Sequence, residues 1–265
     1  MGGAFLLLLI VAMALLAPVL RPGSPWDMVG APLMPPGSPD FPLGSDMLGR
    51  DILSGIMHGA RVSLMIGLVA TLVAVVIGVT VGALAGYFGG IVDDALMRIT
   101  EFFQTIPGFV LLIVLVALFT PTVGSVVVAI GLVSWTPVAR IVRGEFLSLR
   151  TREFVQAAVL MGESDAHIIL FQILPNALSP VIVSASLLVG TSILLESALS
   201  FLGLGDPNLM SWGFMIGAAR TVIRLAWWMS VFPGLAIVLT VLAFNLVGDG
   251  LNDALSPRIS HRGRA

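Results

Sequence analysis

The sequence predicts an all-α polytopic membrane protein with six transmembrane helices. The mean hydropathy of the 265-residue chain is +1.05 and only 11% of its residues are charged, whereas charged residues make up about 25% of a soluble domain. Several apolar runs reach the roughly 20 residues that a helix needs to cross the bilayer core. No segment alternates in hydropathy as barrel strands do, and helices are then the structure that satisfies every backbone group in lipid.

Six apolar runs give the expected membrane spans. They cover residues 3–20, 62–86, 102–120, 123–139, 180–199 and 229–248. The first run could instead be a cleaved signal peptide, since Ala17-Pro18 follows an apolar stretch. It lacks a preceding basic segment and is longer than a usual signal core, so a membrane span is favoured. Because nothing basic precedes Arg21, we expect a cytosolic leader to be missing from the start of the chain.

The arginines set the expected orientation of the chain in the membrane. They number thirteen and the chain has no lysine, so they supply all of its Lys and Arg charge. With six spans, eight share one face of the membrane: Arg98, Arg140, Arg143, Arg150, Arg152, Arg258, Arg262 and Arg264. The opposite face receives five: Arg21, Arg50, Arg61, Arg220 and Arg224. Cytoplasmic segments carry the excess of positive charge. Residues 153–176 and both termini are therefore predicted to be cytoplasmic.

The two longest connections are then extracytoplasmic. Residues 21–61 are rich in Pro, Gly and Asp and cannot form a lipid-facing helix. Residues 200–228 form a second outer segment, whose tryptophans suit the membrane interface. We expect three parts in the chain: a first span with its outer loop (1–61), a membrane core (62–257) with a polar loop at 150–178, and a basic cytoplasmic tail (258–265).

Small residues and prolines indicate how the spans pack. Gly78, Gly82 and Gly86 recur every four residues, so another helix can approach this face closely. Packing inside the bundle is favoured over a seam between two copies. Pro107 in the third expected span and Pro233 in the sixth are expected to bend their helices, because each removes a backbone hydrogen bond.

The stretch EFVQAAVLMGESDAHIILFQILPN, residues 153–176, is a half-polar interruption between two apolar runs. Thr151 is the expected N-cap of a short helix, and Glu153 lies in its first turn, where the helix dipole favours an anion. Its apolar positions follow helical spacing: Phe154, Ala157, Ala158 and Met161. Gly162 is expected to end this helix, Ser164 to cap a second one that Asp165 opens, and Pro175 to end the second.

These signals predict a helix–glycine–helix elbow on the cytosolic surface. Its small apolar face suits insertion into the groove of a partner protein. The alternative is an amphipathic helix lying on lipid, which would carry basic and bulky apolar side chains on opposite faces. Here the apolar side chains are small and the charges are mixed.

The pattern Glu153-x-x-x-Ala157-Ala158-x-x-x-Gly162, closing on Leu174-Pro175, resembles the EAA motif of the membrane subunits of ABC importers. Gln172 stands where that motif commonly has isoleucine. Four more blocks resemble, in the same order, the C-type permease subunit of dipeptide, oligopeptide and nickel importers: PLGSDMLGRDILSGIMHGARVSLMIG (42–67), GYFGGIVDDALMRI (86–99), ESALSFLGLGDPNLMSWGFMI (196–216) and AFNLVGDGLNDALSPR (243–258). Asp206-Pro207-Asn208 departs from the paired prolines frequent in that family.

The resemblance implies a type I ABC importer permease in the plasma (inner) membrane. Its partners would be a B-type permease subunit, two ATPase subunits that bind ATP and Mg, an extracytoplasmic binding protein and membrane lipid, with no nucleic acid and no cofactor on this chain. The residues expected at the ATPase contact are Glu153, Ala157, Ala158, Gly162, Glu163, Ser164, Asp165 and His167. A solvated surface position is an equal alternative for His167. Dipeptides, longer peptides, nickel chelates and haem-like compounds all remain open as cargo.

A carboxylate, Glu196, falls near the end of the fifth run. A carboxylate in a membrane span is costly unless it has a partner or a water-filled cavity. The residues expected to line the pathway or an outer gate are Glu196, Ser200, Phe201 and Trp212. A purely structural role for Glu196 is the equal alternative.

Several function classes lack the residues they need. Without lysine there is no P-loop, and without cysteine there is no thiolate zinc site or cysteine nucleophile. Asp249 and Asp253 are better explained as helix-end contacts than as a metal site, so no catalytic or metal residues are predicted. A channel or ion-coupled secondary transporter is the alternative function, but it should carry more ionisable residues at mid-membrane and internal repeats. An intramembrane serine protease would need a serine and a basic partner buried in neighbouring spans, and the sequence has no such pair.

Overall fold

The computed structural model describes residues 2–255, and this part is helical, with isolated β-bridges but no strand. Its helices, in chain order, are α1 (Gly2–Leu20), α2 (Ile52–Phe88), α3 (Gly90–Thr105), α4 (Gly108–Ala117), α5 (Val123–Leu149), α6 (Glu153–Leu160), α7 (Asp165–His167), the π-helix η1 (Ile168–Ile173), α8 (Leu174–Phe201), α9 (Trp212–Ala219) and α10 (Trp228–Leu255). The predicted basic tail, with Arg258, Arg262 and Arg264, lies outside the described residues.

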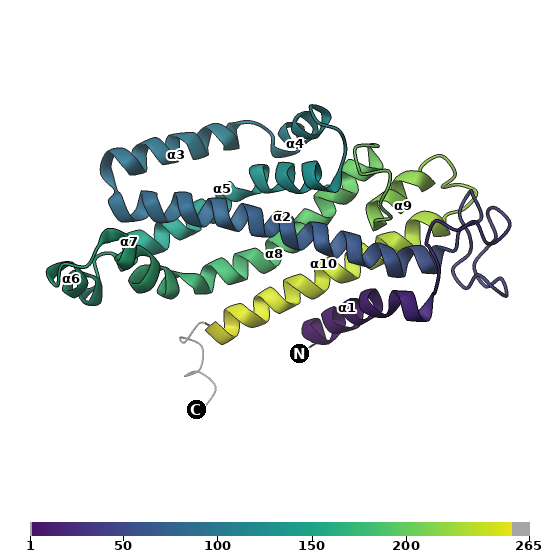
Figure 1. Cartoon of the computed structure of the whole chain (residues 1–265), viewed down its shortest axis with the longest axis horizontal. Helices are drawn as coiled ribbons and strands as arrows, with labels where there is room; N and C mark the ends of the chain where they lie inside the picture. The colour runs from purple at the N-terminus through teal and green to yellow at the C-terminus, as the bar shows by residue number, and fades with distance from the viewer. Residues whose placement is uncertain (1, 256–265) are drawn as a thin grey trace.

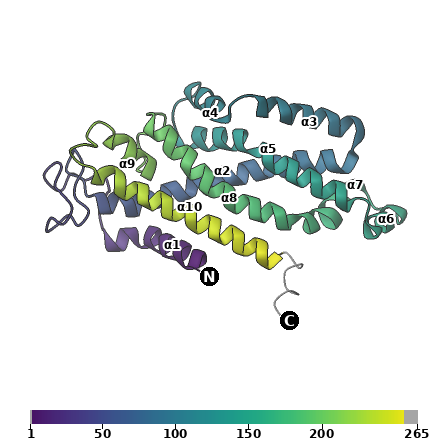
Figure 2. The same ribbon diagram turned by 180° about the vertical axis from the view of Figure 1, so that it is seen from behind.

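Figures 1 and 2 show an elongated bundle with two distinct ends. The elbow, residues 150–176, projects at one end, which we call the elbow end. The loop of residues 21–51 and α9 lie at the other, the loop end. The start of α1 and the end of α10 both point toward the elbow end.

Among residues 2–255, five helical segments are long and apolar enough to cross a membrane, and α3 with α4 would make a sixth as a bent pair. The all-α polytopic fold class is thus confirmed. The third expected span, 102–120, is not a single helix: its first residues belong to α3, and α4 follows at an angle of 85°, so the bend expected at Pro107 is present. Pro107 lies at the break, as the N-cap of α4. It has no N–H to continue the hydrogen bonds of α3.

The second span begins earlier than its hydropathy indicates, at Ile52 rather than at residue 62. Asp51 caps it by accepting a hydrogen bond of 3.0 Å from the Leu53 N–H. The first turns of α2 include His58 and Arg61, which lower the local hydropathy without interrupting the helix. At the same end of the bundle, α10 continues through Pro233.

Helices α2 and α5 form the central pair of the bundle, and glycine allows their close approach. A Cβ added at Gly78 would lie 2.6 Å from Cβ of Val138. One at Gly82 would lie 2.8 Å from Cβ of Val142 and would also contact the Ala139 carbonyl oxygen. A Cβ at Gly86 would meet Phe146. All three glycines therefore face α5 within the same chain, where any side chain would force the helices apart.

Helix α1 is joined to α2 by an arginine that replaces a missing backbone donor. Pro18 lies inside α1 and has no N–H, so the carbonyl of Ala14, four residues earlier, has no helical partner. Arg61 of α2 supplies donors: its Nε donates to the Ala14 carbonyl at 2.6 Å and its Nη2 to that of Leu15 at 3.0 Å. The Arg61 side chain of α2 thus supplies the hydrogen-bond donor that α1 lacks at Pro18.

Replacing Arg61 by methionine should destabilise the docking of α1 by about 1–2 kcal/mol, since it leaves a membrane carbonyl without a donor. The matched change Pro18→Ala restores the helical N–H and should recover most of this loss in the Arg61→Met background. Unfolding of the purified chain in mixed micelles measures both effects. If Arg61→Met lowered the unfolding free energy equally in the wild-type and Pro18→Ala backgrounds, this account would be contradicted.

The loop of residues 21–51 is folded onto the bundle at the loop end. Trp228 Nε1 donates to the Ser45 carbonyl at 3.1 Å. The Arg50 guanidinium lies 4.7 Å from the ring centre of Trp26. The same Trp26 ring packs edge-on against Phe214 of α9. These contacts turn the Pro/Gly-rich segment into a cap over α9 and α10.

Candidate functional site

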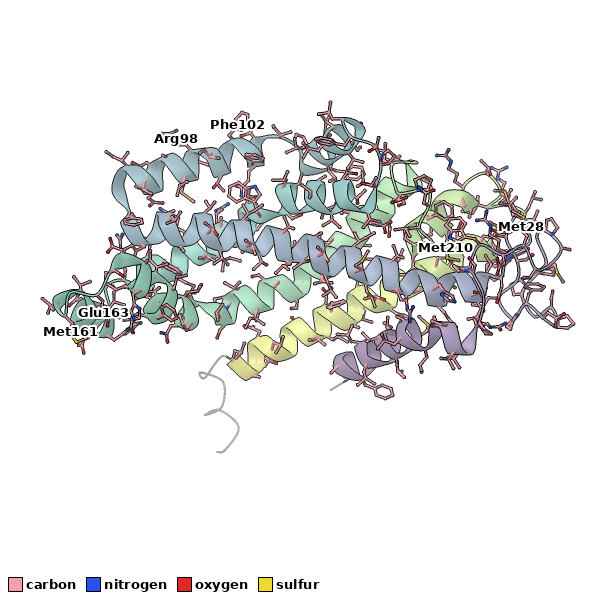
Figure 3. The ribbon with its side chains drawn as sticks, in the orientation of Figure 1. Met28, Arg98, Phe102, Met161, Glu163 and Met210 are labelled. Atoms are coloured by element: carbon pink, nitrogen blue, oxygen red, sulfur yellow. The ribbon has the colours of Figure 1, made fainter. Side chains whose placement is uncertain are left out.

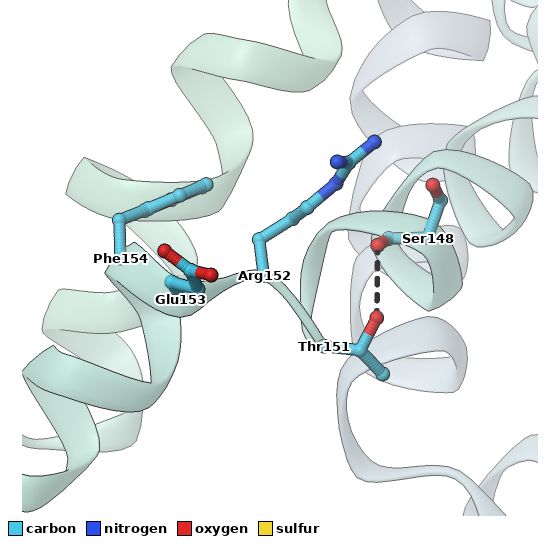
Figure 4. Close-up of a pocket in the computed structure, with 5 residues that line it drawn as sticks. All are labelled: Ser148, Thr151, Arg152, Glu153 and Phe154. Carbon is cyan, nitrogen blue, oxygen red and sulfur yellow. Dashed lines mark hydrogen bonds between the residues drawn. The ribbon is translucent and has the colours of Figure 1, made fainter.

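The elbow begins where α5 ends, and its first cap differs from the one predicted. Thr151 is not the N-cap of α6: Arg152 takes that position with an extended backbone and no side-chain hydrogen bond. The Thr151 hydroxyl instead donates to the Ser148 carbonyl at 3.2 Å, closing the turn after α5 (Figure 4). Glu153 lies in the first turn of α6, as predicted.

An open hollow of about 840 Å³ lies at this turn. Its lining combines a cation, an anion and an aromatic ring (Figure 4): Ser148, Thr151, Arg152, Glu153 and Phe154. The hollow is polar and accessible from outside the bundle. It adjoins the start of α6, the helix that carries the exposed tip of the elbow.

Helix α6 has one buried face and one exposed face. Val155 and Ala158 are buried in a cluster with Ile168 and Ile173 of η1 and with Phe146 of α5. Ala158 is only 1% exposed, so the expectation that it offers a contact surface to a partner must be corrected. Its small side chain lets α6 pack closely on the elbow's own interior. Ala157, the residue before it, is exposed.

The tip of the elbow is apolar and faces outward. Leu160 is 88% and Met161 73% exposed, and Figure 3 shows Met161 at the far end of the molecule. The other exposed large apolar side chains of the elbow are Phe154, Val159, Leu170 and Phe171. Large apolar groups gathered on a polar loop are typical of a protein-contact surface.

Gly162 forms the turn that was predicted for it. Its φ of +82° lies in the left-handed region that favours glycine. The Gly162 N–H donates to the Val159 carbonyl at 3.0 Å, and the Glu163 N–H to that of Ala158 at 3.2 Å. This pair of bonds is a Schellman motif, which closes the end of α6.

After the turn, polar side chains bind within the elbow. Ser164 caps α7 by accepting from the His167 N–H at 3.4 Å. Glu163 Oε2 lies 3.7 Å from His167 Nε2 and accepts from Gln172 Nε2 at 3.4 Å. The exposed His167 also packs against the ring of Phe171. The predicted contact residues after Gly162 thus brace the elbow internally.

Pro175 does not end the second helix, contrary to the prediction. Residues 165–201 form one continuous helical segment in which η1 precedes Pro175. In an α-helix, the proline ring would press on the Phe171 carbonyl and leave it without a donor. The π-helix is wider: the Leu174 N–H bonds five residues back, to Ile169. The widened turn therefore carries the chain past proline into α8.

Sequence reasoning missed the polar contacts that fix the elbow to the bundle. The hydroxyl of Tyr87, the only tyrosine of the chain, donates to Asp165 Oδ1 at 2.6 Å and joins the end of α2 to α7. Arg150 donates to the carbonyls of Gly86 and Tyr87 at 3.1 and 3.2 Å. Arg143 of α5 forms a two-bond ion pair with Asp93 of α3. The one feature of the sequence that could have pointed to these contacts is the single tyrosine, which lies at the end of a helix.

Replacing Tyr87 by phenylalanine should loosen the elbow without unfolding the bundle. The variant keeps the ring but loses the hydrogen bond to a carboxylate, which is worth about 1 kcal/mol at a solvent-accessible position. Amide exchange at residues 165–168 should accelerate about fivefold. Asp165→Ala should have a similar effect, and adding Tyr87→Phe to it should have none. Additive effects of the two changes would contradict the contact.

The predicted outer-gate residues lie near the loop end and mostly inside the protein. Glu196 is 3% exposed and accepts hydrogen bonds from Ser200 at 2.8 Å and Ser211 at 2.7 Å. Trp212 is buried in α9, and its Nε1 donates to the Ile56 carbonyl at 2.9 Å. Phe201, at the end of α8, is partly exposed. These contacts hold α9 against α8 and α2, so a gate at these residues would open only if α9 moved.

Comparisons with known proteins agree with this architecture. Residues 78–261 match the family described as "Binding-protein-dependent transport system inner membrane component". The chain is 38% identical over 268 residues to the di/tripeptide transport system permease protein of Pseudomonas aeruginosa (strain UCBPP-PA14), covering 98% of this chain and 88% of the relative. It is 44% identical over 258 residues to the oligopeptide transport system permease protein of Escherichia coli (strain K12), covering 95% and 84%.

Solved structures share the fold. The chain aligns with the inward-facing MetNI methionine ABC transporter at a TM-score of 0.63 and 21% identity, covering 76% of this chain and 96% of that one. The predicted resemblance to peptide-importer permeases is confirmed by the relatives. The chain therefore belongs to the family of binding-protein-dependent transport system inner membrane components.

Proposed function

We propose that this permease forms, with a second permease subunit, a pathway for peptides, and that two separate ATPase subunits drive it with ATP and Mg. An extracytoplasmic binding protein would deliver the cargo at the loop end. The named relatives transport di- and tripeptides and oligopeptides, which supports a peptide as cargo. The absence of lysine leaves no P-loop in this sequence, which supports ATP hydrolysis in partner chains.

The elbow is the main observation that supports coupling to an ATPase. Its exposed tip offers apolar side chains to a partner, while its buried face joins one cluster with α2, α5 and α8, including Ala83, Val142 and Val181. A displacement of the tip would therefore reach three membrane helices together. Rigid packed clusters transmit such movements because their side chains cannot deform independently.

The arrangement of the helices supports cytoplasmic termini. The start of α1 and the end of α10 point toward the elbow end, and Arg143, Arg150 and Arg152 belong to the last part of α5 and the turn after it, at the same end. Arg21, Arg50 and Arg220 belong to the loop end. With the elbow on the cytosolic side, the count of eight arginines against five in the full sequence follows the positive-inside pattern.

Reconstitution in vesicles tests this function. The complete set of two permeases, two ATPases and binding protein should accumulate radiolabelled Ala-Ala in an ATP-dependent manner. The purified chain alone should give no peptide or ion flux. Flux through the chain alone would indicate a channel or secondary transporter and overturn the proposal, as would failure of the chain to co-purify with an ATPase subunit.

A further inference from the structure

A polar hollow of about 500 Å³ lies between α3 and α5, in the half of the bundle nearer the elbow. Its volume is within the range of small-molecule sites. It is lined by Asp94, Met97, Thr100, Glu101, Gln104, Arg140 and Arg143. The α3 residues of this lining follow helical spacing, so they share one side of that helix.

The hollow lies beside an uncharged stretch of α2. The backbone nitrogen of Arg143 is 3.0 Å from a Cβ placed on Gly82 of α2. Around that glycine, residues 75–86 of α2 read VVIGVTVGALAG, without a charged residue. Arg140 lies about one helical turn from Arg143, farther from the elbow. Charged groups beside so apolar a stretch of a membrane helix face protein or a water-filled cavity, because exposure to lipid is costly.

The charges of the lining are not all used within the chain. Arg143 is paired with Asp93, but the nearest polar partner of Arg140 is a neutral side chain, Gln104, at 3.4 Å. Among residues 2–255, Asp94 and Glu101 form no ion pair. The hollow thus presents a guanidinium from α5 opposite two carboxylates from α3.

We propose that this hollow is a transient binding site for a zwitterionic peptide in the elbow-end half of the pathway. Arg140 would bind the terminal carboxylate, which a guanidinium recognises with two parallel hydrogen bonds. Glu101 and Asp94, about 10 Å apart along α3, would attract the terminal ammonium. This inference rests on the proposed function and adds to it a cargo site.

The cysteine-free sequence allows a direct test by labelling. Met97→Cys places a thiol in the hollow without removing a charge. Phe102→Cys is the matched control on the same helix, since Phe102 is 66% exposed and Figure 3 shows it pointing away from α2. Both variants are assembled with their partner subunits in inverted vesicles. A cationic, membrane-impermeant methanethiosulfonate reagent is added, and modification of this chain is followed over time.

Met97→Cys should react at least tenfold faster than Phe102→Cys, and millimolar Ala-Ala should slow it severalfold. The uncharged analogue N-acetyl-Ala-Ala-amide should not protect, and Arg140→Gln should abolish protection while leaving labelling intact. Slow labelling of Met97→Cys would mean that a neighbouring protein or lipid fills the hollow. Fast labelling without protection would mean a water-filled space with no site. Either result overturns the proposal, while ATP-driven uptake in the same vesicles reports separately on the proposed function.

Discussion

Replacing Leu160 by aspartate should abolish peptide uptake by the assembled importer while leaving the chain in the membrane. Leu160 is 88% exposed at the tip of the elbow, so the change disturbs little within the chain itself. At an ATPase interface, however, it would bury a carboxylate without a partner, at about 3–5 kcal/mol. Binding of the ATPase subunit should weaken more than 100-fold. Co-purification and ATP-dependent uptake measure the two consequences.

A matched control places the same charge far from the elbow. Leu48 is an exposed apolar residue of the loop at the opposite end, and Leu48→Asp should leave ATPase binding unchanged. Gly162→Pro should also impair uptake, because the left-handed turn excludes proline. Normal ATPase binding and uptake by Leu160→Asp would rule out the elbow as the coupling surface.

Replacing Gly82 by leucine should cost the purified chain about 3 kcal/mol or more of folding stability. Even a Cβ there would contact the Ala139 carbonyl and lie 2.8 Å from Val142 Cβ. The backbone oxygen cannot yield as a flexible side chain would, so α2 and α5 must separate and lose contacts along their length. Unfolding in mixed micelles should show a lower midpoint, and expression in the membrane should fall.

Gly144 provides the comparison on the partner helix. It lies in α5 with no atom within 4 Å of an added Cβ. Gly144→Leu should therefore leave the stability of the isolated chain unchanged or raise it by up to about 1 kcal/mol, through better helix propensity. Equal losses from the two substitutions would show that glycine is needed for a reason other than close packing.

Much of the fold followed from local features of the sequence. Hydropathy predicted five of the spans and their order, and Gly162 predicted its turn because a left-handed residue after a helix is a local requirement. Pro107 predicted the bend in the third span, but its angle could not be predicted, since hydropathy records length but not direction. The prediction that Pro175 ends a helix was wrong, because a π-helix can accommodate a proline that would end an α-helix.

Tertiary contacts were harder to predict. Ala157 and Ala158 are chemically identical, and only the packing of α6 on η1 shows that the second is buried. The bond from Tyr87 to Asp165 joins residues 78 positions apart. The polar lining shared by α3 and α5 depends on which side of α3 faces α5, and no local pattern fixes that.

The bond between Arg61 and the Ala14 carbonyl also limits how this permease can be engineered. A generic hydrophobic anchor grafted in place of residues 2–20 would have an intact ladder of helical hydrogen bonds and no free acceptor. Arg61 would then face lipid with its charge uncompensated. Chimeras that exchange the first helix should transfer it together with the matching arginine on the second, as a single inherited unit.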